Sequence, residues 1–371
     1  MSVKRVALAG YYGRGNFGDD LMAVIIGQAI RKWGMEPRVF ALCEPYAGRF
    51  GFEVARTPRE LLDGAGLLVW GGGGALVSWG GRNVDKITRL ELETHAELLD
   101  QAKRRGVRTV AVSVGGGGGT SPPQPRERSA RLISVASWMT VRNQADLALP
   151  RSAGIPCGYF PDIVWRTSEL FAPPARPKGG RLRIGVDIYF ANLRRQHAEY
   201  ALALMQLAVL RRPDIEFIFV DSTNRACSPY RCIGRAVRGP NVTRYQFEQP
   251  DADLELLGGL DAMISTRLHV PVVCLQYGVP VACLFSEGKM RLLLESLGLL
   301  EHYYGHHRAA AWARVMLSGG GWERWIANYR FPPAAYLRDA ALGHLRALEA
   351  EVSGGRAPLL FETAEAGSGG Q

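Results

Sequence analysis

The sequence lacks the signatures of several classes of protein. No two of its six cysteines have Cys-x-x-Cys spacing, and most lie in apolar runs, as reduced and buried cysteines do. It contains neither a metal-ligand spacing nor an apolar run approaching the ~20 residues of a transmembrane helix. The formal net charge of +10 favours anionic ligands, but basic and aromatic residues are not interleaved as in nucleic-acid-binding proteins. Residues 6–10 are expected to form a strand and not a signal peptide, so we predict a cytoplasmic protein. We also expect no bound metal, because the sequence has no metal-ligand spacing.

Apolar runs alternate with helix-length segments along most of the chain. Before residue 171, strands are predicted at 6–10, 38–42, 66–70, 109–114 and 138–141, with helices at 18–32, 91–105 and 129–137. After a proline- and glycine-rich segment, strands are predicted at 183–186 and 216–220 and helices at 198–210, 253–258, 292–297 and 334–349. Such alternation of strand and helix predicts parallel, doubly wound sheets.

The 371 residues suffice for two domains with separate cores. We expect an α/β fold in which two Rossmann-like domains turn their parallel sheets toward a cleft. The predicted divisions are an N-terminal domain with the glycine turns (1–172), a linker (173–181), a C-terminal domain with the catalytic candidates (182–330), a C-terminal helix (331–352) and a disordered tail (353–371).

Three glycine-rich turns follow predicted strands of the first half, at residues 10–20, 70–76 and 114–120. Glycine permits positive φ and close approach to a ligand, so successive N–H groups can face an anion. In a parallel sheet the three turns fall on one edge. The candidate ligand contacts are Gly72, Gly73, Gly116 and Gly117. Alternatively, these glycines only let helices pack closely against strands.

The first turn also fits the dinucleotide-binding pattern, from Gly13 to Gly18. Asp19 and Asp20 follow at the start of the helix, where a pyrophosphate needs the positive end of the helix dipole. Because two carboxylates there would repel a pyrophosphate, a nicotinamide or flavin site is disfavoured. The carboxylates instead suit the hydroxyl groups of a sugar, or they cap the helix and order the turn.

The segment Ser265-Thr-Arg267-Leu-His269 lies where an apolar strand meets a helix that ends at Gly278. Arginine offers a two-pronged donor to a carboxylate or phosphate, and histidine exchanges protons near neutral pH. Both emerge at the carboxyl end of a strand, where open α/β sheets bind ligands. Arg267 and His269 are therefore the candidate catalytic residues. A solvated arginine beside a helix-capping histidine is the alternative.

The remaining histidines are weaker candidates. We expect three of them at the surface of a polar segment, namely His302, His306 and His307. We expect the other three to be partly exposed on helices, namely His95, His197 and His344.

A series of motifs runs along the chain in order. They are Asn16-Phe-Gly-Asp19-Asp20, the glycine runs 71–74 and 115–119, Arg142-Asn-Gln-Ala-Asp146, Pro161-Asp162, Ser265-Thr-Arg267-Leu-His269, Gly278-Val-Pro280 and Lys289. Over residues 5–300 the chain thereby resembles the polysaccharide pyruvyl transferase family. It departs from the family pattern at Asp20, Asn143 and Asp146, where the family has Glu, Glu and Ser.

This resemblance implies a fold similar to two-domain, GT-B-like glycosyltransferases. It implies transfer of the enolpyruvyl unit of phosphoenolpyruvate to hydroxyls of a saccharide, which gives a pyruvate ketal and phosphate. No cofactor is implied, because phosphoenolpyruvate is the donor substrate. A lipid-linked acceptor would bring the protein into peripheral contact with a membrane.

The resemblance also assigns roles to residues. Arg142 and Arg267 would bind the anionic groups of the donor, and His269 would protonate its vinyl carbon. A carboxylate would orient or deprotonate the acceptor. The substrate-binding candidates matched to motifs are Asn16, Asp19, Asp20, Arg142, Asp162 and Lys289.

Two other functions remain open on the sequence. The glycine turns could hold the diphosphate of a nucleotide sugar, which would make the protein a glycosyltransferase on the same two-domain frame. The change to Asn143 beside Arg142 also leaves open a catalytically inactive carbohydrate-binding relative, although retention of Arg267 and His269 argues against it.

Overall fold

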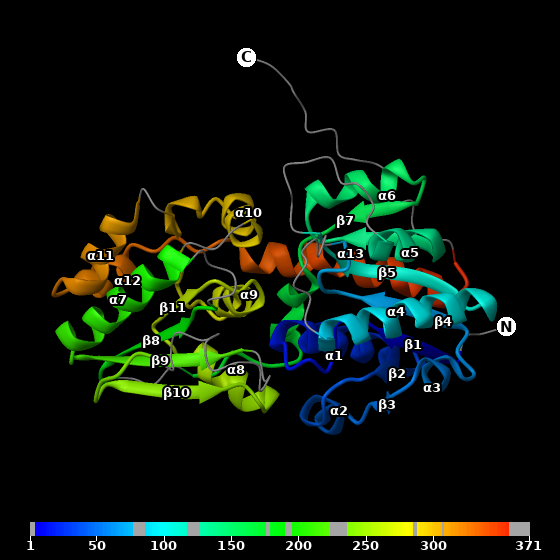
Figure 1. Ribbon diagram of the computed structural model, residues 1–371, viewed down its shortest axis with the longest axis horizontal. Helices are drawn as coiled ribbons and strands as arrows, with labels where there is room; N and C mark the ends of the chain where they lie inside the picture. The colour runs from blue at the N-terminus through cyan, green and yellow to red at the C-terminus, as the bar shows by residue number, and fades with distance from the viewer. Residues whose placement is uncertain are drawn as a thin grey trace, which may run out of the picture. The chain divides into compact units, whose positions relative to one another are not determined.

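The computed structural model describes residues 4–76, 86–116, 127–175, 179–189, 195–222, 236–284, 288–305 and 308–355. By its internal contacts the chain divides into two units (Figure 1). The first comprises residues 1–13, 19–166 and 336–371, and the second comprises residues 14–18 and 167–335. Each unit is an α/β structure around one parallel sheet, as the alternation of strands and helices predicts.

The first unit is built on a seven-stranded sheet in the order β3-β2-β1-β4-β5-β6-β7. Its strands are β1 (Arg5–Ala9), β2 (Glu36–Phe40), β3 (Glu53–Ala55), β4 (Leu67–Gly71), β5 (Arg108–Val114), β6 (Ala136–Val141) and β7 (Cys157–Tyr159). The helical segments are α1 (Phe17–Lys32), α2 (Glu44–Phe50), α3 (Pro58–Leu62), α4 (Lys86–Arg104), α5 (Glu127–Val135), η1 (Gln144–Leu147), α6 (Ala148–Ser152), η2 (Ile163–Glu169) and α13 (Ala334–Val352). Strand order reverses between β1 and β4, the point at which open α/β sheets leave room for a ligand.

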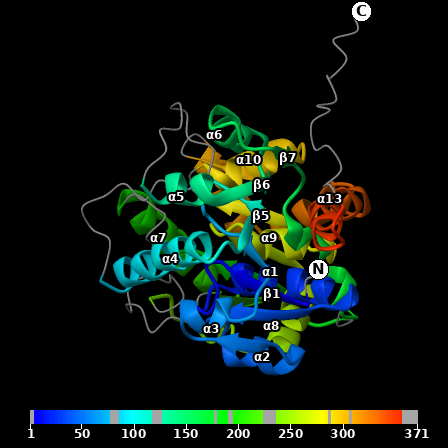
Figure 2. The same cartoon turned by 90° about the vertical axis from the view of Figure 1, so that its right-hand side faces the viewer.

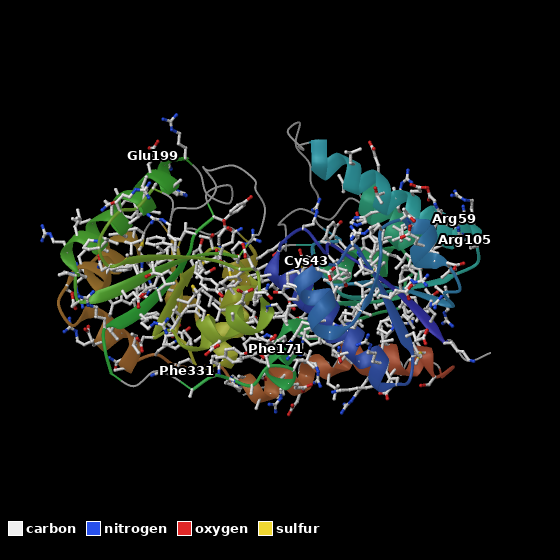
Figure 3. All side chains as sticks on the ribbon, turned by 90° about the horizontal axis from the view of Figure 1, so that it is seen from below. Cys43, Arg59, Arg105, Phe171, Glu199 and Phe331 are labelled. Atoms are coloured by element: carbon white, nitrogen blue, oxygen red, sulfur yellow. The ribbon has the colours of Figure 1, made fainter. Side chains whose placement is uncertain are left out.

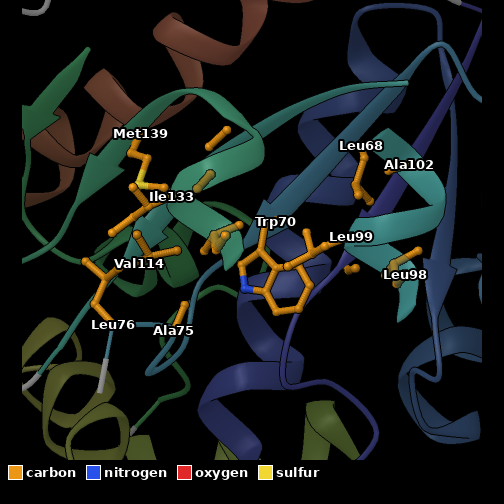
Figure 4. Close-up of a cluster of buried hydrophobic side chains, with 14 of the residues drawn as sticks. Leu68, Trp70, Ala75, Leu76, Leu98, Leu99, Ala102, Val114, Ile133 and Met139 are labelled. Carbon is orange, nitrogen blue, oxygen red and sulfur yellow. The ribbon is translucent and has the colours of Figure 1, made fainter. Parts of the chain in front are cut away.

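Helices cover both faces of the first sheet, with α4 and α13 on opposite sides (Figure 2). The central strands are therefore apolar on both faces, as in Val6–Ala9 and Leu67–Trp70, which are buried throughout. A cluster around Leu68, Trp70, Val114 and Met139 fills one layer between sheet and helices (Figure 4).

The second unit has a six-stranded sheet in the order β10-β9-β8-β11-β12-β13. Its strands are β8 (Leu182–Asp187), β9 (Ile215–Asp221), β10 (Val242–Gln246), β11 (Ala262–Ser265), β12 (Val281–Leu284) and β13 (Tyr303–Tyr304). The helical segments are α7 (Arg195–Arg211), α8 (Pro250–Gly258), α9 (His269–Gln276), α10 (Lys289–Ser296), η5 (Leu300–His302), α11 (Ala309–Leu317) and α12 (Gly321–Ala327). Within each unit, side chains fill the space between the sheet and its helices (Figure 3). Trp312 and Trp322 are fully buried in the second core.

Four predictions about histidines were wrong. The structure buries His95, His197, His302 and His344. His95 packs edge-on against Tyr11 and Trp70, and His302 stacks on Tyr329 with ring centroids 4.2 Å apart, which are contacts that helix periodicity does not reveal. His306 and His307 lie outside the described residues.

The cysteine prediction is confirmed for the described positions. Cys157, Cys274 and Cys283 are buried free thiols and Cys43 is a half-buried one, whereas Cys227 and Cys232 lie outside the described residues. Within the part of the chain that the structure describes, no helix is both long and apolar enough to span a bilayer. The predicted tail lies outside the described residues beyond Gly355.

Helix α13 is attached to the first unit by buried polar contacts. Nδ1 and Nε2 of His344 lie 2.7 Å from Thr140 Oγ1 and 3.0 Å from the carbonyl oxygen of Pro161. Near the end of the helix, Trp138 Nε1 donates to Glu351 Oε2 at 2.9 Å. Burial lowers the pKa of His344 from 6.5 to about 4, so the imidazole is neutral in the folded protein at neutral pH.

We predict that His344 makes the first unit sensitive to acid. As pH falls below 6.5 the unfolded chain gains a proton on this imidazole while the folded protein does not until pH reaches about 4. Stability is therefore lost across that window, by about 2 kcal/mol between pH 7 and pH 5. The free energy of unfolding is measured by urea titration at pH 7 and pH 5 for wild type and for His344→Gln. Because carboxylates also titrate in this range, the contribution of His344 is the difference between the two proteins in their loss of stability. The same pH dependence in both proteins would contradict this account.

Candidate functional site

The segment after β11 is held in place by its own hydroxyl groups. Ser265 Oγ accepts a hydrogen bond from the backbone N–H of Arg267 at 2.9 Å, which closes a tight turn after the strand. Thr266 donates its N–H to the carbonyl of Asp187 (3.0 Å) and accepts one from the N–H of Tyr189 (2.9 Å). The ends of β8 and β11 are thus tied together, and this fixes the direction in which Arg267 leaves the sheet.

The Arg267 guanidinium is oriented by an amide and an aromatic ring. Its Nη2 donates to Asn16 Oδ1 at 3.0 Å, and its Cζ lies 5.1 Å from the centroid of the Tyr189 ring. Among the residues that the structure describes, Asn16 is its one hydrogen-bond partner. The cation–π contact leaves the edge of the guanidinium free to meet a planar anion.

Residues 14–18 belong to the second unit by their contacts, although they are far from it in sequence. The N–H of Phe17 donates to the carbonyl of Ser222 at 3.1 Å, and its ring packs edge-on against Phe247 with centroids 4.9 Å apart. Gly18 lies directly against the His269 imidazole, so that a Cβ at this position would overlap the ring. Asn16 and Gly18 thereby bring the first motif onto Arg267 and His269.

His269 is the first residue of α9, and it is 8% exposed. Its position follows from the sequence: the apolar run of β11 ends in Ser265-Thr266, and a helix begins three residues later. The imidazole therefore lies between its own helix and Gly18, at the strand end that sequence analysis predicted.

Sequence reasoning missed Asp187, the last residue of β8. Its side chain is buried, and its Oδ2 accepts a hydrogen bond from Ser222 Oγ at 3.0 Å. Burial raises the pKa of Asp187 to about 7, against the opposing charge of Arg267 and hydrogen bonds from Ser222 and Ser265. The available signal was a carboxylate at the end of an apolar strand, a position where α/β sheets place ligand contacts.

In the first unit, Asp20 holds the first glycine turn. Its Oδ1 accepts the N–H of Gly13 at 2.6 Å and its Oδ2 lies 3.4 Å from the Cys43 sulfur. Gly13 has φ +67°, and a Cβ there would overlap the carbonyl of Ala41. Burial and, to a lesser extent, the charge of Asp19 raise the pKa of Asp20 to about 7, against the hydrogen bond from the N–H of Gly13. This arrangement matches the alternative in which the carboxylate orders the turn.

The other two glycine turns are hydrogen-bonded to each other and to the sheet. The N–H of Gly72 donates to Val112 at 2.7 Å, and that of Gly115 donates to Gly73 at 3.0 Å. The N–H of Gly73 lies 3.2 Å from the Met22 sulfur. These contacts favour the alternative in which the glycines allow close packing. Gly117 lies outside the described residues.

Arg142 and Asp162 form a buried ion pair in the first unit, with Nη1 2.8 Å from Oδ2 and both side chains at most 6% exposed. Asp146 accepts the N–H of Gly116 at 2.8 Å and the side-chain amide of Asn143 at 3.0 Å. Asn143 therefore supports the last glycine turn through Asp146.

The candidate residues thus fall into two groups. Asn16, Arg267 and His269 lie together in the second unit, where Lys289 begins α10 half-buried. The group in the first unit comprises Asp19, Asp20, Gly72, Gly73, Gly116, Arg142 and Asp162. No cluster of three histidine, cysteine or carboxylate side chains that could hold a metal ion occurs among the residues described.

Two α/β units, each built on a parallel sheet, give the chain a GT-B-like fold. The chain belongs to the polysaccharide pyruvyl transferase family, whose model matches residues 16–284. The matched region includes Asn16, Arg267 and His269 but not Lys289.

Solved structures confirm the fold class. A proposed UDP-N-acetylglucosamine 2-epimerase from Listeria monocytogenes superposes with a TM-score of 0.65 at 12% identity, over 96% of this chain and 99% of that one. The MnaA–UDP structure from S. aureus gives 0.63 at 9% identity (94% and 97%), and the UDP-GlcNAc 2-epimerase of Neisseria meningitidis gives 0.54 at 10% (94% and 99%). The comparison with curated proteins gave no match.

We predict that Gly18→Ala destabilises the protein by about 1–3 kcal/mol, because the new methyl group overlaps the His269 ring. In a His269→Ala background the cost should largely disappear, so denaturant unfolding of the four proteins should give a coupling energy of at least ~1 kcal/mol.

The matched control is Gly48→Ala in α2, where a Cβ would meet only Glu44 Oε1 at 3.7 Å. This change should be neutral or stabilise by about 0.5–1 kcal/mol. Equal effects of Gly18→Ala in both backgrounds would rule out the predicted contact.

Proposed function

We propose that the protein transfers the enolpyruvyl group of phosphoenolpyruvate to two hydroxyls of a saccharide, forming a pyruvate ketal and releasing phosphate. The proposal rests on one observation: Asn16 and Gly18 pack on Arg267 and His269 in the second unit. Two family motifs that are separated by 251 residues thus form one site.

The proposed reaction requires a binding site for an anion and, next to it, a group that donates a proton. A proton added to the methylene carbon of phosphoenolpyruvate gives a methyl group and leaves C2 as an oxocarbenium-like centre. Two hydroxyl oxygens then bond to C2 while the C2–O bond to phosphate breaks. Of the two protons that the hydroxyls release, one balances the new methyl group and the other leaves on phosphate.

The site geometry suits these steps. The guanidinium of Arg267, held by Asn16 and Tyr189, presents its open edge to a carboxylate or phosphate. His269 is two residues away, and an imidazole can deliver a proton near neutral pH. We assign donor binding to Arg267 and protonation of the vinyl carbon to His269. Asp19 and Asp20 remain the acceptor-side candidates.

The decisive experiment is incubation of the protein with phosphoenolpyruvate and a panel of free, aryl and lipid-linked sugars. Release of phosphate together with a product carrying the mass of a pyruvate ketal supports the proposal. A parallel arm replaces phosphoenolpyruvate with UDP-N-acetylglucosamine, because the structural neighbours are described with UDP or its sugar. Turnover in that arm alone would favour a nucleotide-sugar enzyme. No turnover in either arm, with sugar binding retained, would favour an inactive relative.

We predict that His269→Gln lowers turnover by about 10²–10⁴-fold, the usual worth of general acid catalysis. The glutamine keeps a polar group of similar size next to Gly18 but cannot deliver the proton. Calorimetric binding of phosphoenolpyruvate should survive, so that the loss lies in kcat. Turnover within a few-fold of wild type would show that another group or water supplies the proton.

We predict that Arg267→Lys weakens donor binding by roughly tenfold or more, since a point charge replaces a two-pronged donor worth about 1.5–3 kcal/mol. The loss should fall mainly on the apparent affinity for phosphoenolpyruvate. Arg314→Lys, on an exposed position of α11 in the same unit, is the control and should behave as wild type. Unchanged donor dependence in Arg267→Lys would remove Arg267 from the site.

A further inference from the structure

Asp187 occupies an unusual position in the second unit. It ends β8 between the ends of β9 and β11, where it is 4% exposed. Its Oδ2 accepts the Ser222 hydroxyl at 3.0 Å, and its backbone carbonyl accepts the N–H of Thr266. Asp187 is therefore held at the ends of β8 and β9, and its backbone is bonded to the residue that precedes Arg267.

Two charged groups face this carboxylate among the described residues. Arg267, from the segment after β11, favours the ionised form, whereas Asp221, at the end of β9, disfavours it. The hydroxyls of Ser222 and Ser265 also favour the ionised form through hydrogen bonds, and burial opposes it most strongly. Together these effects give Asp187 a pKa of about 7, and the charge of Arg267 is one of the effects that lower it.

Arg267 cannot neutralise two anions at once. With no ligand, its positive charge stabilises the nearby carboxylate. When a dianion meets the open edge of the guanidinium, it adds negative charge close to Asp187 in a buried environment, where charges interact more strongly than in water. The added negative charge raises the pKa of Asp187, so the carboxylate is protonated when the anion binds.

We infer that Asp187 is a positioning residue for Arg267 that takes up a proton when an anionic substrate binds, so that anion binding and protonation of Asp187 are linked. This inference deepens the proposed function and rests on its assignment of Arg267 to the donor. A protonated Asp187 leaves the charge of Arg267 uncancelled and still occupies its place between the strand ends.

The direction of the pH dependence follows from this linkage. The pKa of Asp187 is about 7 in the free protein, and a bound anion raises it. At pH 6 the group is already mostly protonated, so affinity is at its plateau. Above pH 7 each bound anion must bring a proton with it, and affinity should fall about three- to fivefold between pH 7 and pH 8.

The test uses calorimetric titration with sulfate, a dianion that carries no proton in this pH range. Titrations at pH 7.5 in two buffers of different ionisation enthalpy count the protons taken up on binding. Wild type should take up about half a proton or more per sulfate, and Arg267→Gln should abolish the binding. Failure of sulfate to bind wild type, or binding without proton uptake, overturns the inference.

Variants separate the linkage from a structural role. Asp187→Asn keeps an acceptor for Ser222 and should bind sulfate with no proton uptake and a flat pH profile. Ser222→Ala removes a hydrogen bond to the ionised carboxylate, so its loss of affinity should move to higher pH; this second variant decides the matter if Asp187→Asn fails to fold. Asp251→Asn, exposed on α8 in the same unit, should keep wild-type proton uptake.

Repeating the titrations with phosphoenolpyruvate distinguishes this inference from the proposed function. Linked sulfate binding without binding or turnover of phosphoenolpyruvate would refute the proposed function and leave an anion site with Asp187 as its proton acceptor. Turnover of phosphoenolpyruvate with equal proton uptake in wild type and Asp187→Asn would keep the function and refute the role of Asp187.

Discussion

The packing of residues 14–18 on the end of β11 is the constraint on which the candidate site depends. Asn16 orients Arg267, and Gly18 provides the space that the His269 ring occupies. The same segment starts α1, which continues into the first unit at Asp19. Any side chain at position 18 would have to displace the imidazole, so glycine here is a packing requirement set by a residue 251 positions away.

Much of the fold could be predicted because parallel strands buried on both faces are continuous apolar runs. β1, β4, β5, β8 and β9 lie within one residue of their predicted bounds. The edge or near-edge strands β3, β7, β10 and β13 were missed, because short or polar segments such as Val242–Gln246 become strands only through pairing with a neighbour. Helix α3 could have been found: Thr57 and Glu60 form a capping-box-like start, with Thr57 Oγ1 accepting the N–H of Glu60 at 3.2 Å.

The site was predictable as far as its motifs reach. Asn16, Arg267 and His269 could be named from sequence patterns. Asp187 and Ser222 come close to the site only because β8, β9 and β11 end side by side, and local sequence does not predict the order of strands in a sheet. The pairing of Arg142 with Asp162 is a similar case. Sequence reasoning treated both as substrate contacts, and the structure adds that each neutralises the other in a buried ion pair. Removing one partner would leave an uncompensated buried charge, so loss of activity in either variant would not by itself assign substrate contact.

Burial changes what an aspartate contributes near an anion. From sequence alone, a carboxylate beside a glycine turn or an arginine counts as a full negative charge that repels phosphate. Asp20 and Asp187 are both buried, and burial raises the pKa of each to about 7, so each is largely neutral on the acid side of neutrality. The repulsion expected at the start of α1 is therefore weaker than two full negative charges would produce. At β8, the same effect turns a carboxylate that would cancel Arg267 into a hydrogen-bonded acid that leaves its charge available. A basic anion site can in this way be built on acidic residues, provided that the strand ends keep water away from them.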